Sequence, residues 1–249
     1  MLPRMRIRTA LQTLVLGVAV LIGLVTLHAQ SPAAPPSPAR AARPDVHPVS
    51  GRTFARPMGV EGAAWLDRPE RVSEEAPDEA IRFLKLRPGM VVADIGAGSG
   101  YFTTRMARLV GPTGKVYAED VQPAMLDILR RTVAREKLTN VVPVLGELND
   151  PKLPAGAIDL AIMVDVYHEL WEPQLVLQRL RRSLKPTGRL VLLEYRGEDL
   201  RIPIIPEHKM TRRQAQVELE AEGFRLADEY EELPRQHLFV FAPAVTPTR

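Results

Sequence analysis

Val91-Val92-Ala93-Asp94-Ile95-Gly96-Ala97-Gly98-Ser99-Gly100 is the stretch that decides the fold of this chain. A short apolar run that ends in glycines at alternate positions predicts a strand buried on both faces, followed by a tight loop. Residues 101–110 then carry apolar side chains at helical spacing, so the loop opens a helix. This order of strand, glycine loop and helix lets the backbone approach a nucleotide-like ligand closely.

The sequence on both sides of this stretch continues the same alternation of strands and helices. A helix is predicted from Pro77, and the following elements are strands at 115–119, 141–145, 157–164 and 189–194 and helices at 123–137 and 173–184. Nearly all-apolar strands that alternate with helices predict an α/β fold, a doubly wound parallel sheet covered on both faces. Thr211 caps a last helix that runs to Glu222, and the strands 224–232 and 237–242 follow. Their short connection requires an antiparallel pair.

Composition excludes several classes of function. The 249 residues carry a formal charge of +3, and the N-terminal Arg4, Arg6 and Arg8 account for that whole excess. The rest of the chain is balanced, so nucleic acid is not an expected partner. The sequence has no cysteine, which excludes disulfides, thiolate metal sites and a cysteine nucleophile.

The N-terminal segments predict export or membrane anchoring. Residues 1–29 have a basic start, an apolar run and the small Ala29, which is the pattern of a secretory signal peptide or an uncleaved anchor. Membrane contact is expected only through residues 10–29, and a bacterial protein would be periplasmic or otherwise extracytoplasmic. The alternative is a cytoplasmic protein that starts at Met58. Residues 30–60 are rich in proline and alanine and predict a disordered linker, so the domain is expected at 61–249.

The spacing of the glycine loop narrows the choice of ligand. A dinucleotide loop needs G-x-G-x-x-G, but here the third glycine is Gly100 and the bulky Tyr101 follows it. Asp94, two residues before the first glycine, would repel a pyrophosphate and would suit a ligand with a positive amino group. This chemistry favours S-adenosylmethionine, which carries an ammonium and a sulfonium.

Asp94-Ile95-Gly96-Ala97-Gly98-Ser99-Gly100 resembles motif I of the class I S-adenosylmethionine-dependent methyltransferases, and the resemblance extends over about residues 79–242. It implies seven strands in the order 3-2-1-4-5-7-6 with the last strand antiparallel. It also implies a set of cofactor-binding residues, which are Asp94, Gly96, Ala97, Gly98, Gly100, Asp120 at the ribose, Glu147 and Leu148 at the adenine, and Asp165. Glu119 is a second, poorer match to the ribose acid.

Asp165-Val166-Tyr167-His168-Glu169 resembles the family's motif beside the methyl group, which makes His168 and Asp165 candidate catalytic residues. Either could take a proton from a hydroxyl or amine acceptor. Each candidate residue also has a structural interpretation: the glycines as a tight turn, Asp120 as a helix-capping acid, Glu147 as a solvated acid, and Asp165 with His168 as a hydrogen-bonded pair. No metal site is predicted, because the histidines at 168, 208 and 237 lie in separate predicted elements.

The predicted function is therefore an S-adenosylmethionine-dependent methyltransferase that acts on a small-molecule or protein acceptor. Acceptor specificity is expected to come from the region around Trp65 and from residues 196–209, both over the carboxyl edge of the sheet. Two alternatives stay open. One is an NAD(P)-dependent oxidoreductase, and the other is an exported domain of the same fold that binds a ligand without catalysis.

Overall fold

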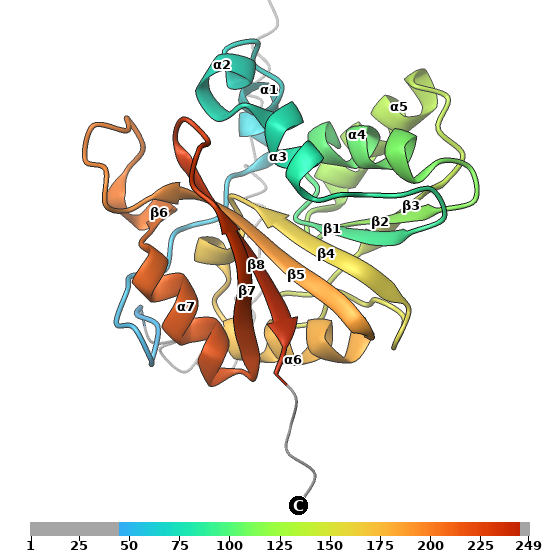
Figure 1. The fold of residues 1–249 in the computed structure, drawn as a ribbon. Coiled ribbons are helices and arrows are strands. Elements are labelled where there is room, and N and C mark those ends of the chain that lie inside the picture. Colours follow the sequence, from blue (N-terminus) through green and yellow to red (C-terminus); the bar gives the residue numbers. More distant parts are fainter. Residues whose placement is uncertain (1–44, 245–249) are drawn as a thin grey trace, which may run out of the picture. The chain divides into compact units, whose positions relative to one another are not determined.

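An eight-stranded sheet runs through residues 45–244, the part of the chain that the computed structural model describes (Figure 1). The strands are β1 Val91–Ile95, β2 Lys115–Asp120, β3 Val141–Leu145, β4 Ile158–Val164, β5 Leu184–Arg196, β6 Lys209–Met210, β7 Phe224–Tyr230 and β8 Gln236–Pro243. Their order is β3-β2-β1-β4-β5-β8-β7, and the two-residue β6 pairs with β5. β8 is antiparallel to β5 and β7. The expected order is confirmed, and β6 is one strand more than predicted.

Helices cover both faces of the sheet. The α-helices are α1 Ala63–Leu66, α2 Arg71–Glu75, α3 Pro77–Phe83, α4 Tyr101–Val110, α5 Pro123–Arg135, α6 Pro173–Ser183 and α7 Arg212–Ala221. Short 3₁₀ turns are η1 Val60–Gly62, η2 Tyr167–Glu169 and η3 Pro206–His208. Thr211 caps α7, as its sequence predicts, and the structure adds a capping box with Gln214. In the described part of the chain, no helix is long and apolar enough to cross a membrane.

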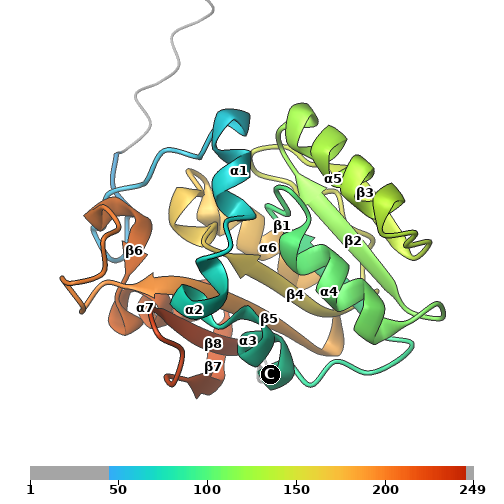
Figure 2. The same cartoon turned by 90° about the horizontal axis from the view of Figure 1, so that it is seen from above.

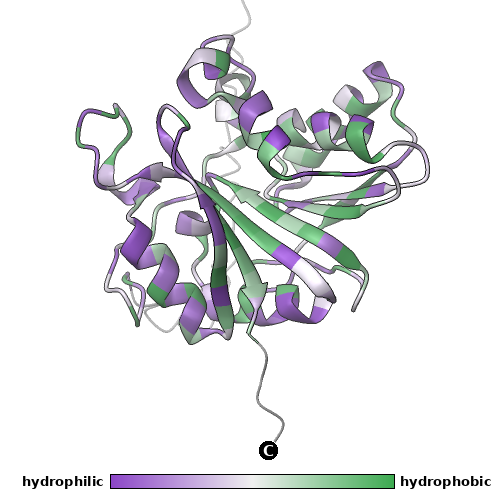
Figure 3. Ribbon diagram, in the orientation of Figure 1, coloured by the Kyte–Doolittle hydropathy of each residue, from purple (hydrophilic) through white to green (hydrophobic). Residues whose placement is uncertain are grey.

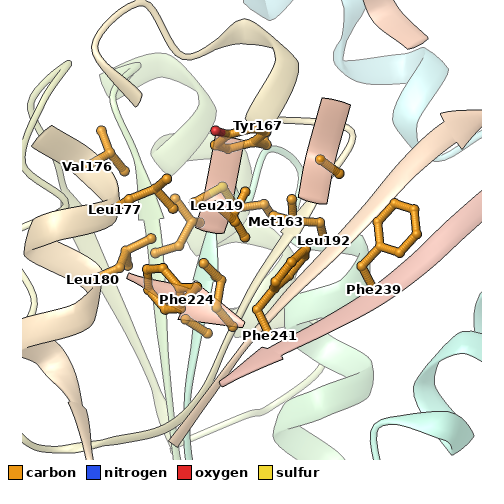
Figure 4. Close-up of a cluster of buried hydrophobic side chains, with 14 of the residues drawn as sticks. Met163, Tyr167, Val176, Leu177, Leu180, Leu192, Leu219, Phe224, Phe239 and Phe241 are labelled. Atoms are coloured by element: carbon orange, nitrogen blue, oxygen red, sulfur yellow. The ribbon is translucent and has the colours of Figure 1, made fainter. Parts of the chain in front are cut away.

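The strand at the centre of the fold is buried on both faces, which its apolar run predicts. In β1, Ala93 and Ile95 belong to an apolar layer shared with α6 and α7, whereas Val92 belongs to a second layer shared with α3 and α4. Figure 4 shows the first layer, in which side chains of α6 and α7 meet those of the strands. The central strands are correspondingly hydrophobic along their length (Figure 3). Burial on both faces fixes the carboxyl end of β1 in the middle of the sheet.

One predicted turn is wrong. The predicted helix 173–184 and strand 189–194 leave residues 185–188 as a turn between them, but β5 already begins at Leu184. The pairing of β4 with β5 is irregular between Ile158 and Leu160, because residues 185–188 of β5 lie between the partners of these two residues. Gly188 permits this, because a Cβ there would lie 2.7 Å from the carbonyl oxygen of Ile158.

The structure also corrects the predicted linker. Residues 1–29, and the linker up to residue 44, lie outside the described residues. The remainder, however, packs on the domain: Phe54 and Ala55 are buried, and the Ala55 amide donates to the carbonyl of His168. Arg52 forms a buried ion pair with Glu218 of α7 at 2.9 Å. The composition of residues 45–60 does not reveal this packing, because the ion pair of Arg52 depends on Glu218, which is distant in the sequence.

Candidate functional site

The glycine loop connects β1 to α4 at the carboxyl edge of the sheet. Gly96, Gly98 and Gly100 all have positive φ, from 54° to 89°, a conformation that glycine adopts without strain. A Cβ at Gly96 would lie 2.6 Å from the Val166 side chain, so the segment after β4 lies directly against the loop. Ala97 is buried, and its carbonyl accepts from the Gly100 amide at 2.9 Å. The loop is thus closely packed on the side of β4.

Asp94 lies beneath the loop and is 2% exposed. Its carboxylate accepts a hydrogen bond of 2.5 Å from the Thr103 hydroxyl of α4. Burial raises the pKa of Asp94 to about 7, against the opposing effects of Thr103 and the Arg71 charge. A buried carboxylate with so high a pKa is stabilised in its ionised form by a cation placed beside it.

Two further carboxylates end β2 beside the loop. The Asp120 carboxylate accepts from the Gly98 amide at 3.0 Å and from the Gln122 amide at 2.8 Å. The Glu119 carboxylate accepts from the Gly96 amide at 3.4 Å. Burial, with the Asp120 charge, raises the pKa of Glu119 to about 8, and burial also raises the pKa of Asp120. Asp120 therefore lies against the glycine loop, and Glu119 is a second buried acid within reach of the loop.

A cavity of about 690 Å³ opens beside these acids. It is lined by residues after β2 and β3, by the N-terminal segment and by the residue before α6, namely Pro57, Met58, Gly59, Val121, Gln122, Gly146, Glu147, Leu148, Asn149 and Glu172. The Gln122 side chain donates to the Met58 carbonyl at 2.9 Å and so joins the two walls. Glu147 and Leu148 line this cavity, although the Glu147 carboxylate is exposed and paired with Lys152 at 3.0 Å.

The segment of helix α1 lies against the glycine loop (Figure 2). Asp67, just after α1, accepts from the Ser99 hydroxyl at 2.9 Å. A Cβ at Gly98 would lie 2.7 Å from Leu66. The segment from Met58 to Asp67 therefore lines the cavity at one end and contacts the glycine loop at the other.

Asp165 is held in place by neighbouring side chains. It follows β4 with φ of +54°, and Gln236 of β8 donates to both of its carboxylate oxygens at 2.9 Å. Arg71 of α2 lies 3.9 Å away. Burial, together with the charge of Glu75, raises the pKa of Asp165 well above its ordinary value. These partners tie β4, β8 and α2 together at the carboxyl edge.

His168 lies in η2 and is 1% exposed. Its Nδ1 is 2.5 Å from Glu194 Oε2 in β5, and its Nε2 is 3.0 Å from His208 Nδ1 in η3. Burial opposes the charged ring, but the Glu194 carboxylate outweighs this and raises the pKa of His168. The pKa of His208 is lowered by burial and by the charge of His168.

Glu169 completes this group, since its Oε1 is 3.6 Å from His208 Nδ1. Sequence reasoning missed Glu169, Glu194 and His208 as site residues, and it predicted no metal site because the histidines lie in separate elements. His168 and His208 are separated by 40 residues, and only the folding of residues 196–208 back over β5 brings them together. No local spacing signals such a contact.

A family model described as a methyltransferase domain matches residues 86–233. A crystal structure of an S-adenosylmethionine-dependent methyltransferase from Aquifex aeolicus superposes with a TM-score of 0.71 at 30% identity, covering 76% of this chain and 100% of that one.

Curated relatives match over shorter stretches. A protein-L-isoaspartate O-methyltransferase from Methanothrix thermoacetophila is 34% identical over 55% of this chain and 60% of its own length. A ubiquinone/menaquinone biosynthesis C-methyltransferase from Pasteurella multocida is 35% identical over 44% of this chain and 41% of its own. The chain thus spans about half the length of these relatives.

Proposed function

The chain belongs to the class I S-adenosylmethionine-dependent methyltransferases, and from this membership we propose that it transfers a methyl group from S-adenosylmethionine to a small-molecule acceptor. One observation carries the proposal: the Asp120 carboxylate accepts from the Gly98 amide of the glycine loop at 3.0 Å, and the residues directly after Asp120 line the cavity. The family match does not support the oxidoreductase alternative.

The proposed cofactor position follows the carboxyl edge from β1 to β3. Asp94 and the glycine loop would hold the methionine moiety through its ammonium, and Asp120 would bond to the ribose hydroxyls. Leu148 would contact the adenine in the cavity, and Glu147, released from Lys152, would accept from the adenine amino group. Each carboxylate with a raised pKa then gains a donor or a positive charge on binding.

The reaction is a displacement at the methyl carbon. An electron pair of the acceptor forms the new bond to carbon, the carbon–sulfur bond breaks, and its electron pair returns to sulfur, which leaves S-adenosylhomocysteine. Sulfonium is a good leaving group, so the protein contributes chiefly alignment and exclusion of water. The glycine loop and the segment from Met58 to Asp67 supply these two effects.

A protonated acceptor also has to lose its proton. In the metal-free chain, we propose that His168 accepts this proton, because Glu194 stabilises the resulting imidazolium. The proton reaches His168 through His208, which lies against its Nε2. Asp165 is proposed as a positioning residue, since Gln236 and Arg71 already engage its carboxylate.

Coverage of the carboxyl edge favours a small acceptor over a protein. Met58 lines the cavity, Leu66 lies against the glycine loop, and His208 lies against His168. Segments on both sides of the predicted methyl position therefore restrict the approach of a folded protein surface.

The test uses the purified full-length chain with S-adenosylmethionine labelled in its methyl group. The chain is incubated with the small-molecule and protein fractions of a host extract, each in turn. We expect label in the small-molecule fraction, and much less with Asp120→Asn than with the exposed control Asp127→Asn. Label confined to proteins would refute the acceptor class. Absence of transfer to both fractions, with S-adenosylhomocysteine bound, would favour the non-catalytic alternative.

Export or anchoring through residues 1–29, with the domain on the extracytoplasmic side, is part of the same proposal. The basic, then apolar sequence of this segment supports it. Cell fractionation with N-terminal sequencing tests it: a mature chain that begins at Gln30 or a membrane-bound full chain supports export, and a soluble cytoplasmic chain that begins at Met58 contradicts it.

A further inference from the structure

Two histidines and a glutamate converge at the carboxyl edge of the sheet. His168 and Glu169 belong to η2, and His208 belongs to η3. One nitrogen of each histidine and one carboxylate oxygen all lie within 4.8 Å of one another. Two imidazoles and a carboxylate are a donor set that divalent transition-metal ions favour. We propose that His168, Glu169 and His208 bind one divalent transition-metal ion.

One separation between the donor atoms lies in the range for such an ion, and a second is slightly longer. Zinc–nitrogen bonds are about 2.0–2.1 Å, so two donors on one ion lie about 3.0–3.4 Å apart. His168 Nε2 and His208 Nδ1 are 3.0 Å apart, and His208 Nδ1 and Glu169 Oε1 are 3.6 Å apart. The Glu169 and His168 donor atoms lie within 4.8 Å of each other, so the Glu169 side chain, which is 16% exposed, must move toward the two histidines to bind the same ion.

Glu194 orients the first ligand. Its carboxylate is fully buried and lies 2.5 Å from His168 Nδ1, where it accepts a hydrogen bond from the ring. In the neutral ring this leaves the lone pair on Nε2, the atom that faces His208. The other carboxylate oxygen accepts from the Tyr167 amide at 2.9 Å, which fixes the orientation of Glu194. A carboxylate that orients a histidine toward an ion is a recurrent feature of metal sites.

Without an ion, the contact between the two rings is a simple hydrogen bond. His208 Nδ1–H would then donate to His168 Nε2, and Glu169 would pair with a protonated His208. This arrangement accounts for the ring contact, but with a neutral His208 it leaves Glu169 bonded to the Met58 amide and to neither ring. The ion engages all three side chains at once.

The site adjoins the cavity. Glu169 Oε1 accepts from the Met58 amide at 3.3 Å, and Met58 lines the cavity. Three protein ligands leave at least one position of a four-coordinate ion for another donor. On the proposed function, on which this clause rests, that position takes an oxygen or nitrogen of the methyl acceptor. The bound ion then lowers the acceptor pKa, and His168 serves as a ligand and not as a base.

Metal titration of the full-length chain tests the site, with no cofactor present. After treatment with a chelator, the chain is titrated with Zn²⁺ by calorimetry and with Co²⁺ by visible absorption. We expect one ion per chain and a cobalt spectrum of tetrahedral or five-coordinate type. His208→Gln and Glu169→Gln should each weaken binding at least tenfold, and Glu194→Gln by about 10- to 100-fold.

His237→Gln is the matched control, because the His237 ring bonds to Glu198 and Glu231 and to none of the three proposed ligands. It should bind the ion as the wild type does, and circular dichroism should show that each variant is folded. The inference is overturned if the wild type binds no ion, or if His208→Gln binds it equally well. A chain that binds the ion but not S-adenosylhomocysteine would refute the proposed function and support the metal site. A chain that binds S-adenosylhomocysteine but no ion would refute the metal site and support the proposed function.

Discussion

Replacing Arg52 with methionine should cost the domain much of its stability, because it leaves a buried carboxylate without its main partner. The Arg52 guanidinium donates to both oxygens of Glu218 at 2.9–3.2 Å and to the His168 carbonyl at 2.9 Å. The Glu218 side chain is fully buried and the Arg52 side chain is 4% exposed. Removing one partner of a buried ion pair costs about 3–5 kcal/mol.

The lower end of this range applies here. Ser50 still donates to Glu218, and His47 Nε2 still lies 3.3 Å from it, so part of the charge remains compensated. We expect Arg52→Met to lose about 3 kcal/mol of unfolding free energy. At about 2–4 °C per kcal/mol for a domain of this size, the midpoint falls by roughly 6–12 °C.

Denaturant unfolding of the full-length chain measures this effect. Arg52→Met/Glu218→Leu should recover most of the loss, because the uncompensated charge is gone. Arg201→Met is the matched control, since that arginine is 91% exposed and should change stability by less than about 0.5 kcal/mol. A loss below about 1 kcal/mol for Arg52→Met would refute the anchoring of residues 45–57 by this pair.

Two further predictions concern the acids beside the glycine loop. The raised pKa of Glu119, about 8 in the folded chain against 4.5 as its ordinary value, means that the folded state keeps a proton that the unfolded state releases. The contribution of Glu119 to the free energy of unfolding is full below pH 4.5 and is lost as the pH rises through 8. The slope of this loss is at most about 1.4 kcal/mol per pH unit. Glu119→Gln cannot release this proton, so the stability of that variant should fall less with pH. Thermal melts from pH 5 to 8 check this, and parallel curves for the two chains would contradict it. Gly146→Ala places a Cβ 1.7 Å from Glu119 Oε1 and should destabilise the domain by about 1–3 kcal/mol. Glu119→Ala in the same chain should relieve most of that loss in denaturant unfolding, and an unaltered loss would show that the clash is elsewhere.

The sequence predicts the elements whose signals are local. The strand Val91–Ile95 and the helix Tyr101–Val110 match their predicted bounds, because an apolar run and a set of glycines define them without help from distant residues. The antiparallel end of the sheet follows from a connection too short for a crossover. The positions of Asp94 and Asp120 beside the loop follow from the same local order.

The features that the sequence does not predict depend on single long-range contacts. Proline-rich composition indicates disorder up to residue 60, but Arg52 meets Glu218 across 166 residues of chain and orders the segment. His208 follows an irregular stretch with no periodic pattern, and it approaches His168 only because β6 pairs with the end of β5. In the sequence, Glu194 is a single acid at the end of a predicted strand. Its role in orienting His168 is evident only from their contact in the structure.

Binding of S-adenosylhomocysteine tests the central claim most directly. Calorimetric titration of the full-length chain should give one site per chain, at least tenfold weaker binding for Asp120→Asn, and unchanged binding for the exposed Asp127→Asn. Absence of binding to the wild type, or equal affinity of Asp120→Asn, would contradict the assignment of the glycine loop and Asp120 as the cofactor site.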